Sequence, residues 1–429
     1  LRRPSLQLPT SVVLQPYPNN FALFSLMRRT SLILLAAATF SVQVNAQGSP
    51  ASLTKAQVNL WGRLLQMTDG RTLDTALVRQ GLNSTVPALR ASAALAIGQV
   101  GKTAAAPGLP ILRAALSDQD QNVVSNAAYA LGLLGDSASA PMLRNLLNRN
   151  PAVGINAAWA LGTIGASARS ALLDGVADPG IGPRVKTQLL LAAAKLKPVP
   201  VAELRPYLKS RNASLAWAAS YAMARSHAVP GARDLIALAS ASNVSGTCRT
   251  CNPVRSEVPY YNNVLGRHRA RAEAARMLTR TVAGDSLAGP SIAALKVLMK
   301  DPHPHVRVNA VRSLSTFGPA VRDDVLGGTR DRDANVRIAA AQVVGGVLDT
   351  AQAGWLAVWG RDTSYMYRTS LVASAAARGI LLASIASWGN HPDWRYRASF
   401  AGAIGSIPNR VAPDPAVIRL LTDPDRRGR

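Results

Sequence analysis

The chain has 429 residues, of which 48% are hydrophobic and only 5% aromatic, and its net charge is +25. A composition rich in alanine and leucine but poor in aromatic rings disfavours a β-sandwich core and favours closely packed helices. Forty of the 48 basic residues are arginine. A high-GC coding sequence also produces this bias, so the charge alone does not indicate a nucleic-acid ligand.

The first 46 residues have the pattern of an export signal preceded by foreign sequence. Residues 1–26 are rich in proline and lack periodicity, so we expect a disordered, non-native translation upstream of a start at Met27. Met27–Arg29 form a basic segment, residues 32–40 are apolar, and small residues precede Gln47. This pattern predicts a Sec-type signal peptide over 27–46, cleaved after Ala46. The alternative is a buried first helix; an exported protein would be periplasmic or extracellular.

The rest of the chain repeats one unit. Asp301–Arg307 returns thirty residues later as Asp331–Arg337, and Ala127–Gly132 returns as Ala157–Gly162. A period near 30 predicts a solenoid, because one such unit cannot bury its own apolar face. No other apolar run reaches 18 residues, so no membrane span is expected.

Each clear unit reads as a first helix, a turn with Asp and often Pro, a second helix, and Gly. Val306, Ala310 and Leu314 form one apolar stripe along a second helix. Second helices are therefore expected near 87–97, 122–133, 153–163, 183–195, 213–224, 267–280, 305–316, 335–347, 365–377 and 394–404.

Two residue types mark the ends of these helices. Glycine after the last apolar position allows a left-handed end without a Cβ clash, and it occurs as Gly101, Gly135, Gly165 and Gly318. Aspartate before the second helix predicts an N-cap, and it occurs as Asp118, Asp301 and Asp331.

The domain organisation follows from these units. Residues 47–82 are expected to form N-terminal capping helices, and 83–429 an array of about ten helical hairpins, lengthened by an insertion near 243–264. Residues 417–425 read as a first helix and its turn with no second helix after them. We therefore expect a truncated array, with Leu420 and Leu421 uncovered.

The Asp-Pro, Val-Arg, Ala-Ala and Leu-Gly positions resemble the HEAT repeat, in the subtype named after phycobilisome-lyase proteins, over roughly 75–425. The resemblance implies an all-α, right-handed α-α superhelix with the second helices on its concave surface. It implies no single function, because such arrays serve as scaffolds, peptide receptors, lyase subunits and DNA-repair enzymes.

The only two cysteines, Cys248 and Cys251, lie in the insertion. In an exported protein this spacing favours a disulfide. A zinc site would need two further ligands, for which only His227 and His268 are at hand. No metal or other cofactor is predicted.

Arginines suggest two different roles. Arg307 and Arg337 keep step with Asp301 and Asp331, which indicates a structural Arg–Asp ladder between units. One helix is strongly basic and is either a solvated face or an anion-binding surface; its candidates are Arg267, Arg269, Arg271, Arg276 and Arg280.

A candidate partner-binding line lies along the second helices. Its members are Asn126, Tyr129, Asn156, Trp159, Tyr221, Asn309 and Arg312. An asparagine three residues before an aromatic shares its helical face, and armadillo-type peptide receptors are similar in using Asn and Trp. The alternative is packing between repeats for the rings and solvation for the amides.

No catalytic motif is present: the chain lacks Gly-x-Ser-x-Gly, a phosphate loop and paired metal-binding histidines. We therefore predict a non-catalytic exported scaffold that binds a protein or peptide on its concave face. One alternative rests on resemblance to the N-terminal region of long cyclophilin-type peptidyl-prolyl isomerases. The other is an anionic-polymer binder, similar to HEAT-like DNA glycosylases. The oligomeric state is not predicted.

Overall fold

The computed structural model describes residues 53–227, 229–240, 258–348, 364–376, 386–405 and 415–425. The chain divides into a unit Leu1–Thr54 and a unit Lys55–Arg429. The expected non-native segment 1–26, the signal peptide 27–46 and the Cys248–Cys251 pair lie outside the described residues, so these expectations stay predictions. The described residues contain helices and no strand.

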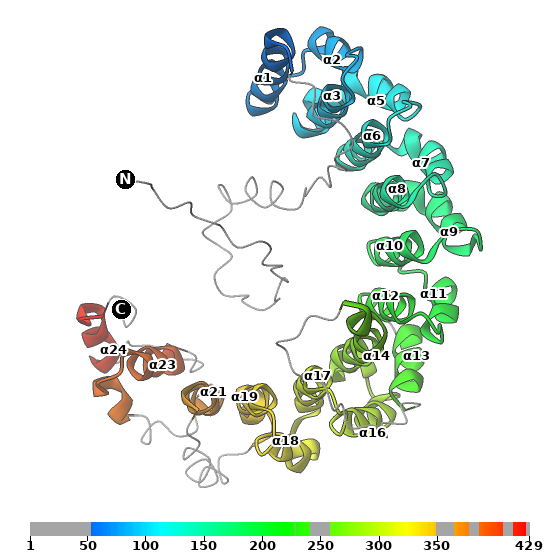
Figure 1. Cartoon of the computed structure of the whole chain (residues 1–429). Coiled ribbons are helices and arrows are strands. Elements are labelled where there is room, and N and C mark those ends of the chain that lie inside the picture. Colours follow the sequence, from blue (N-terminus) through cyan, green and yellow to red (C-terminus); the bar gives the residue numbers. More distant parts are fainter. Residues whose placement is uncertain are drawn as a thin grey trace, which may run out of the picture. The chain divides into compact units, whose positions relative to one another are not determined.

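The unit Lys55–Arg429 is built of two layers of helices, as the repeat predicts (Figure 1). The layer of second helices lies on the inner side of its curve. It consists of α3 (Pro87–Gln99), α6 (Gln121–Leu134), α8 (Pro151–Ile164), α10 (Pro183–Ala193), α12 (Ala213–Ala224), α14 (Val258–Met277), α17 (Pro304–Leu314), α19 (Ala334–Val343), α21 (Tyr365–Ala376) and α23 (Trp394–Gly405).

The layer of first helices lies outside it. It consists of α2 (Thr75–Leu82), α5 (Leu109–Ala115), α7 (Ala140–Leu146), α9 (Arg169–Ala177), α11 (Val201–Leu208), α13 (Val229–Ser240), α16 (Ala288–Leu298), α18 (Arg322–Gly328) and α24 (Pro415–Arg419), with α1 (Lys55–Asp69) beside α2 and α3. The short connecting helices are α4 (Lys102–Ala105), α15 (Arg280–Ala283) and the 3-10 turns η1 (Ala106–Gly108), η2 (Ser137–Ser139), η3 (Gly165–Ala168), η4 (Ser315–Val321), η5 (Val344–Gly346), η7 (Ala386–Asn390) and η8 (Leu420–Thr422).

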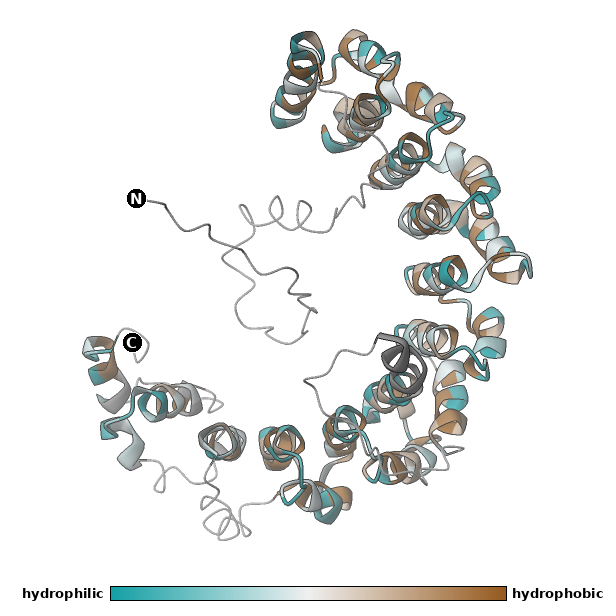
Figure 2. Cartoon of the chain, in the orientation of Figure 1, coloured by the Kyte–Doolittle hydropathy of each residue, from teal (hydrophilic) through white to brown (hydrophobic). Residues whose placement is uncertain are grey.

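All ten expected second helices are present, and the all-α solenoid is confirmed. The largest difference is α14, which begins at Val258, so the last part of the expected insertion 243–264 is helical. Apolar residues run along both layers (Figure 2), and one continuous core extends from Leu64 to Leu371.

Second helices approach one another closely because small residues meet between them. A Cβ added to Gly132 would lie 2.7 Å from the Cα of Ala160, and one added to Gly162 would lie 2.5 Å from the Cβ of Ala192. These distances are shorter than carbon–carbon contacts allow, so only glycine permits this spacing of α6, α8 and α10.

The glycines expected at helix ends do adopt positive φ. Gly135 ends α6 at φ 71° and ψ 34°, in the left-handed helical region. Gly101, Gly165 and Gly318 have φ of 101°, 83° and 75°. A side chain at these positions would be strained, which is the physical basis of the prediction.

The predicted N-caps were wrong by two residues. The caps of α6, α17 and α19 are Asp120, His303 and Asp333. Each aspartate accepts two backbone N–H groups of the first helical turn, and His303 accepts one. The expected caps Asp118, Asp301 and Asp331 lie two residues earlier. Each of those carboxylates accepts the N–H of the cap residue instead.

The prediction that both leucines near residue 420 are uncovered was also wrong in part. Leu421 is 69% exposed, whereas Leu420 is only 7% exposed and packs with Val372, Phe400 and Ile404. The η8 turn places the two neighbouring side chains on opposite sides, so α23 covers one of them.

Candidate functional site

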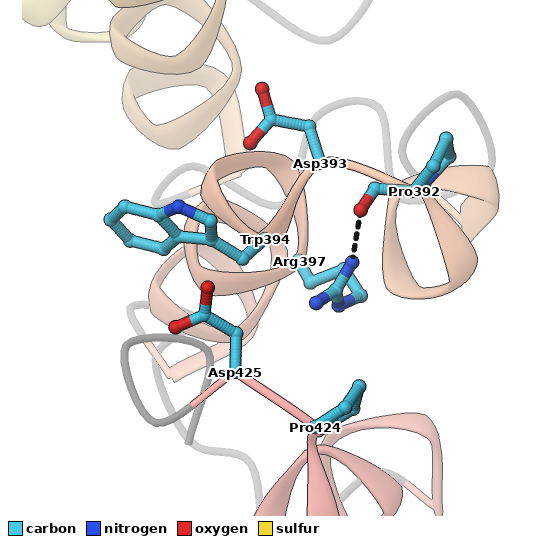
Figure 3. A pocket seen from close by; sticks show the side chains of 6 residues that line it. All are labelled: Pro392, Asp393, Trp394, Arg397, Pro424 and Asp425. Carbon is cyan, nitrogen blue, oxygen red and sulfur yellow. Dashed lines mark hydrogen bonds between the residues drawn. The ribbon is translucent and has the colours of Figure 1, made fainter.

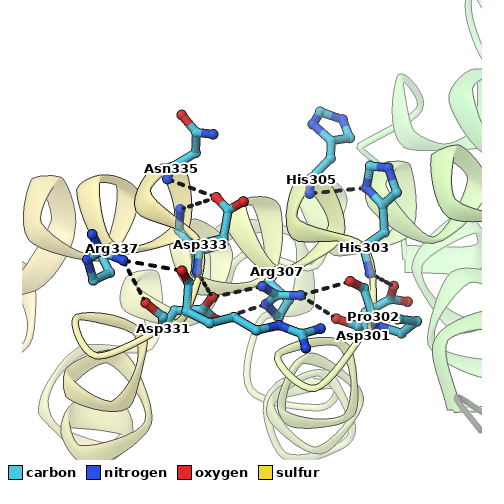
Figure 4. Close-up of polar contacts among 11 residues, drawn as sticks. Asp301, Pro302, His303, His305, Arg307, Asp331, Asp333, Asn335 and Arg337 are labelled. Atoms are coloured by element: carbon cyan, nitrogen blue, oxygen red, sulfur yellow. Dashed lines mark hydrogen bonds and ion pairs between the residues drawn. The ribbon is translucent and has the colours of Figure 1, made fainter. Parts of the chain in front are cut away.

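The expected ladder of Arg–Asp pairs joins neighbouring repeats. In Figure 4, the Arg307 side chain of α17 lies along the turn before α19. Its Nε and Nη2 atoms each donate to Asp331 at 2.8 Å, while Nη1 donates to the carbonyls of Asp301 and Pro302 at 2.8 and 3.1 Å. The Arg307 side chain is only 5% exposed. All three of its guanidinium nitrogens therefore donate within the array, and its role is structural.

The same geometry recurs along the array. Arg90, Arg307, Arg337 and Arg397 each donate to the carbonyl six residues earlier. The pairs that join successive second-helix units are Arg90–Asp118, Arg271–Asp301, Arg307–Asp331 and Arg397–Asp423. First helices are joined to the following unit by Arg113–Asp136, Arg144–Asp178 and Arg205–Asp234. Arginines of this kind are structural.

Two histidines, His268 and His303, lie beside one ladder carboxylate. Asp301 is fully buried and accepts from Arg271, with His268 Nδ1 at 3.4 Å. Burial opposes its charge, yet the hydrogen bonds from His268 and Arg271 prevail and lower its pKa to about 2. The ring centroids of His268 and His303 lie 4.8 Å apart. Burial, followed by the charges of His268 and His305, lowers the pKa of His303 to about 4.

Outside the ladder, cations meet aromatic rings on the second helices. Tyr129 of α6 stacks on Trp159 of α8, with ring centroids 4.5 Å apart at an interplanar angle of 27°. The Lys195 ammonium lies 4.9 Å from the Trp159 ring centroid and donates to Thr163 Oγ1 at 2.9 Å. Partial burial lowers the pKa of this ammonium. Tyr129 and Trp159 belong to the binding line predicted from the repeat, whereas Lys195 and Thr163 do not.

A second aromatic cluster joins α12 to α14. Trp217 and Tyr221 have ring centroids 6.1 Å apart. The Arg269 guanidinium lies 5.5 Å from the Trp217 ring, and that of Arg225 lies 5.8 Å from the Tyr221 ring. The distances are typical of cation–π contacts.

One carboxylate lies among these groups. Arg276 Nη2 lies 2.6 Å from Glu273 Oε2. Burial raises the pKa of Glu273, whereas Arg276, Arg225 and a hydrogen bond from Trp217 oppose this rise. Glu273 therefore accepts a hydrogen bond from the Trp217 indole, and Arg276 neutralises much of the charge of the Glu273 carboxylate.

The predicted asparagines are used inside the array. Asn126 donates to the Ala91 carbonyl of α3 at 3.0 Å, and Asn156 donates to Ser125 Oγ of α6 at 2.6 Å. Asn309 donates to the His305 carbonyl of its own helix at 3.0 Å. The first two amides bridge adjacent repeats and are not simply solvated, which the sequence alone did not indicate.

The five arginines of the predicted basic helix have different surroundings. Arg271 pairs with buried Asp301, Arg276 with Glu273, and Arg280 with Asp285. Arg269 contacts the Trp217 ring and has no acid partner among the described residues. The side chain of Arg267 lies outside the described set.

Arg312 of α17, taken from the predicted binding line, also lacks an acid partner among the described residues. Its Nη2 donates to the neutral Gln342 Oε1 at 2.9 Å. Burial lowers the pKa of this guanidinium. The cation is therefore partly desolvated without being neutralised by a carboxylate of this part of the chain.

Sequence reasoning missed Trp217, Lys195 and Arg225. Trp217, Tyr221 and Arg225 follow one another at intervals of four residues, so one helical stripe could have revealed two of them. Lys195 follows the end of α10 and carried no comparable signal.

A shallow hollow lies where α23 meets the turn after η8 (Figure 3), with a volume of about 530 Å³. Its lining residues are Pro392, Asp393, Trp394, Arg397, Pro424 and Asp425. Arg397 is bound to Asp423 and to the carbonyls of His391 and Pro392. The hollow thus lies beside the Arg397–Asp423 ladder pair, and its one arginine is already bound within the array.

Two further properties hold for the described residues. No group of three or more His, Cys, Asp or Glu side chains among them is arranged to hold a metal ion. None of their helices combines the length and the apolar character needed to cross a bilayer.

Comparison with known proteins identifies the repeat. The family model described as HEAT repeats matches residues 75–153, 110–194 and 267–345. These segments therefore contain HEAT repeats. No curated protein sequence matches the chain significantly.

Among solved structures, importin beta is similar at a TM-score of 0.52 and 15% identity, over 90% of this chain. The chain spans 59% of that importin beta chain, and this likeness shows the fold alone. Kap121p bound to Nup53p has a TM-score of 0.45 at 12% identity, over 84% of this chain and 48% of that one. An engineered protein has a TM-score of 0.39 at 15% identity, over 77% of this chain and 97% of that one.

Proposed function

We propose that this HEAT-repeat array is a non-catalytic scaffold that binds a protein or peptide on the layer of second helices. The observation that carries the proposal is the contrast between two sets of cations. Ladder arginines such as Arg307 and Arg397 have bidentate carboxylate partners. Lys195 and Arg225, just after the ends of α10 and α12, and Arg269 of α14 instead lie against partly exposed aromatic rings.

Rings of this kind support binding because they offer large, rigid apolar area at low entropic cost. Tyr129, Trp159, Trp217 and Tyr221 are only partly buried. They also belong to helices fixed by the core and the ladder, so a partner would meet a preorganised surface.

The test uses peptides selected for binding to the full chain from a random display library. We expect the double variant Trp159→Ala with Tyr221→Ala to weaken their binding about tenfold or more, the usual cost of losing aromatic contacts at the centre of an interface. The matched control is Met142→Ala on the outer helix α7, where Met142 is 41% exposed. Unchanged affinity in a double variant with wild-type circular dichroism would refute the proposal.

We further propose that the protein is exported by residues 27–46. Support comes from the basic, apolar and small-residue segments in that order. The N-terminus of the protein secreted by a bacterial host should begin at Gln47, and Ala46→Arg should block cleavage. An N-terminus that retains Met27 would contradict the proposal.

A further inference from the structure

Three arginines without a carboxylate partner among the described residues lie where α12, α14 and α17 pack in sequence. Arg225 at the C-cap of α12, Arg269 of α14 and Arg312 of α17 form no ion pair with any described residue. Arg225 and Arg269 lie against rings, and Arg312 donates to a neutral amide. We call these three arginines the cationic face.

The three helices bring these charges into one neighbourhood. The pKa of His305 is lowered by burial and then by the charges of Arg269, Arg312 and Arg276, so all three guanidiniums act on one imidazole of α17. The charge of Arg225 acts on Glu273, which Arg276 also contacts, by favouring its ionised form. Since Arg276 neutralises Glu273, the cationic face retains an excess of positive charge.

Such an excess is unfavourable without a ligand. Like charges on adjacent helices repel, and burial of Arg312 removes part of its hydration. The ladder arginines Arg90, Arg271, Arg307 and Arg397, by contrast, are each neutralised by an aspartate. Arg225 and Arg269 instead lie against Tyr221 and Trp217 without forming an ion pair with a described residue, which favours an anionic partner arriving from outside.

We propose that the cationic face is the docking site for an acidic protein segment whose side-chain carboxylates bind Arg269, Arg312 and Arg225. The proposal rests on the scaffold function proposed above and names the chemistry of its partner. A guanidinium stacked on a ring keeps its N–H edge open, and that edge fits a carboxylate bidentately.

The spacing also suits an extended peptide. Packed helices lie about 8–10 Å apart, and alternate side chains of an extended chain are separated by about 7 Å. Acidic residues at every second position therefore reach arginines on successive second helices. The partner's backbone would then run across the helices, as the order of the three arginines requires.

A nucleic acid fits this face less well. Bases bind single-strand sites by stacking on aromatic rings, but Arg269 and Arg225 already lie over the rings of Trp217 and Tyr221. Stacking would have to displace both guanidiniums, whereas carboxylates bind them in place.

The test measures fluorescence anisotropy of a labelled twelve-residue peptide of alternating Glu and Ala, mixed with the full chain in 50 mM salt. Arg269→Gln with Arg312→Gln should weaken binding at least tenfold. The matched control is Arg330→Gln with Arg332→Gln, which removes the same charge from two exposed residues. That control should stay within twofold of wild type, and a Gln–Ala peptide should not bind.

Several results would overturn the proposal. One is absence of binding by the wild-type chain, and another is an equal loss in both double variants, which would indicate a general charge effect. A third is tighter, equally arginine-dependent binding of a single-stranded oligonucleotide. If display-selected peptides depend on Trp159 and Tyr221 but not on Arg269 and Arg312, the scaffold function stands and this docking site fails. If neither pair matters, both proposals fail.

Discussion

Arg307 and Asp331, 24 residues apart in the chain, form a bidentate ion pair with both N–O distances at 2.8 Å. The same guanidinium also closes the turn of its own repeat through the carbonyls of Asp301 and Pro302. The Arg307 side chain therefore stabilises both the turn before its own helix, α17, and the turn before the next second helix, α19.

Arg307→Gln should destabilise the array by about 3 kcal/mol, because a partly buried carboxylate loses its partner and two carbonyls lose a charged donor. Urea unfolding followed by circular dichroism measures the change. Arg330→Gln, at an exposed position one residue before Asp331, should change the unfolding free energy by less than about 0.5 kcal/mol. Equal effects of the two variants would contradict a structural role for the pair.

Gly162→Ala should destabilise α8 against α10 by about 1–2 kcal/mol. The new methyl group would overlap Ala192, and this overpacking outweighs the gain in helix propensity. Gly62→Ala is the control with the opposite sign. Gly62 lies inside α1, where an added Cβ meets nothing within 4 Å, so propensity should stabilise by about 0.5–1 kcal/mol. A stabilising Gly162→Ala would disprove the close approach of the two helices.

His303 should make the array less stable as the pH falls from about 7 to 4. Its native pKa is lowered to about 4, below the ordinary value of about 6.5. Between these two pH values the His303 imidazole is protonated in the unfolded chain but neutral in the native chain. The free energy of unfolding therefore decreases as the pH decreases. The groups that face His303 are His268, His305, Asp301 and Arg271.

The variant His303→Asn isolates this effect. Asparagine can still accept the His305 N–H that His303 Nδ1 now accepts at 3.2 Å, but it does not titrate. We expect the decline in stability between pH 7 and 4 to become smaller by about 1 kcal/mol, a value discounted because the ring is partly exposed. An unchanged pH profile would show that His303 titrates normally.

Asp301 should affect the stability of the array at a lower pH than His303 does. Its native pKa is lowered to about 2, against about 3.9 in an unfolded chain. The stabilisation is complete above pH 4 and is lost as the pH falls through 2; it amounts to about 2 kcal/mol. Asp301→Asn should remove this part of the acid transition, which thermal melts between pH 5 and 2 would detect. The exposed Asp323→Asn should leave that transition in place.

Sequence reasoning succeeded where the backbone or a repeated charge pair dictates the residue. The positive φ of Gly135 and the Arg307–Asp331 pair follow from steric and electrostatic needs that recur in several units. The caps were misplaced because Asp301 satisfies two demands, the His303 N–H and the Arg271 guanidinium. A single sequence does not show which acceptor serves which donor.

The binding line was harder to predict. Helical spacing placed Tyr129 and Trp159 together correctly, since one period brings equivalent positions side by side. It could not show that Asn156 is committed to Ser125. Nor could it separate Arg271, which is neutralised, from Arg269, which is not, because that difference depends on contacts thirty residues away.

The ladder has a consequence for how such a chain can grow. Arg90, Arg271, Arg307 and Arg397 each reach forward to an aspartate of the following unit. A unit that contains both such an arginine and such an aspartate can pair with another copy of itself. If the unit is duplicated or removed whole, the arginine of the preceding unit still has an aspartate in the unit that follows it. Recombination at unit boundaries can thus change the number of repeats without leaving a ladder arginine or aspartate unpaired.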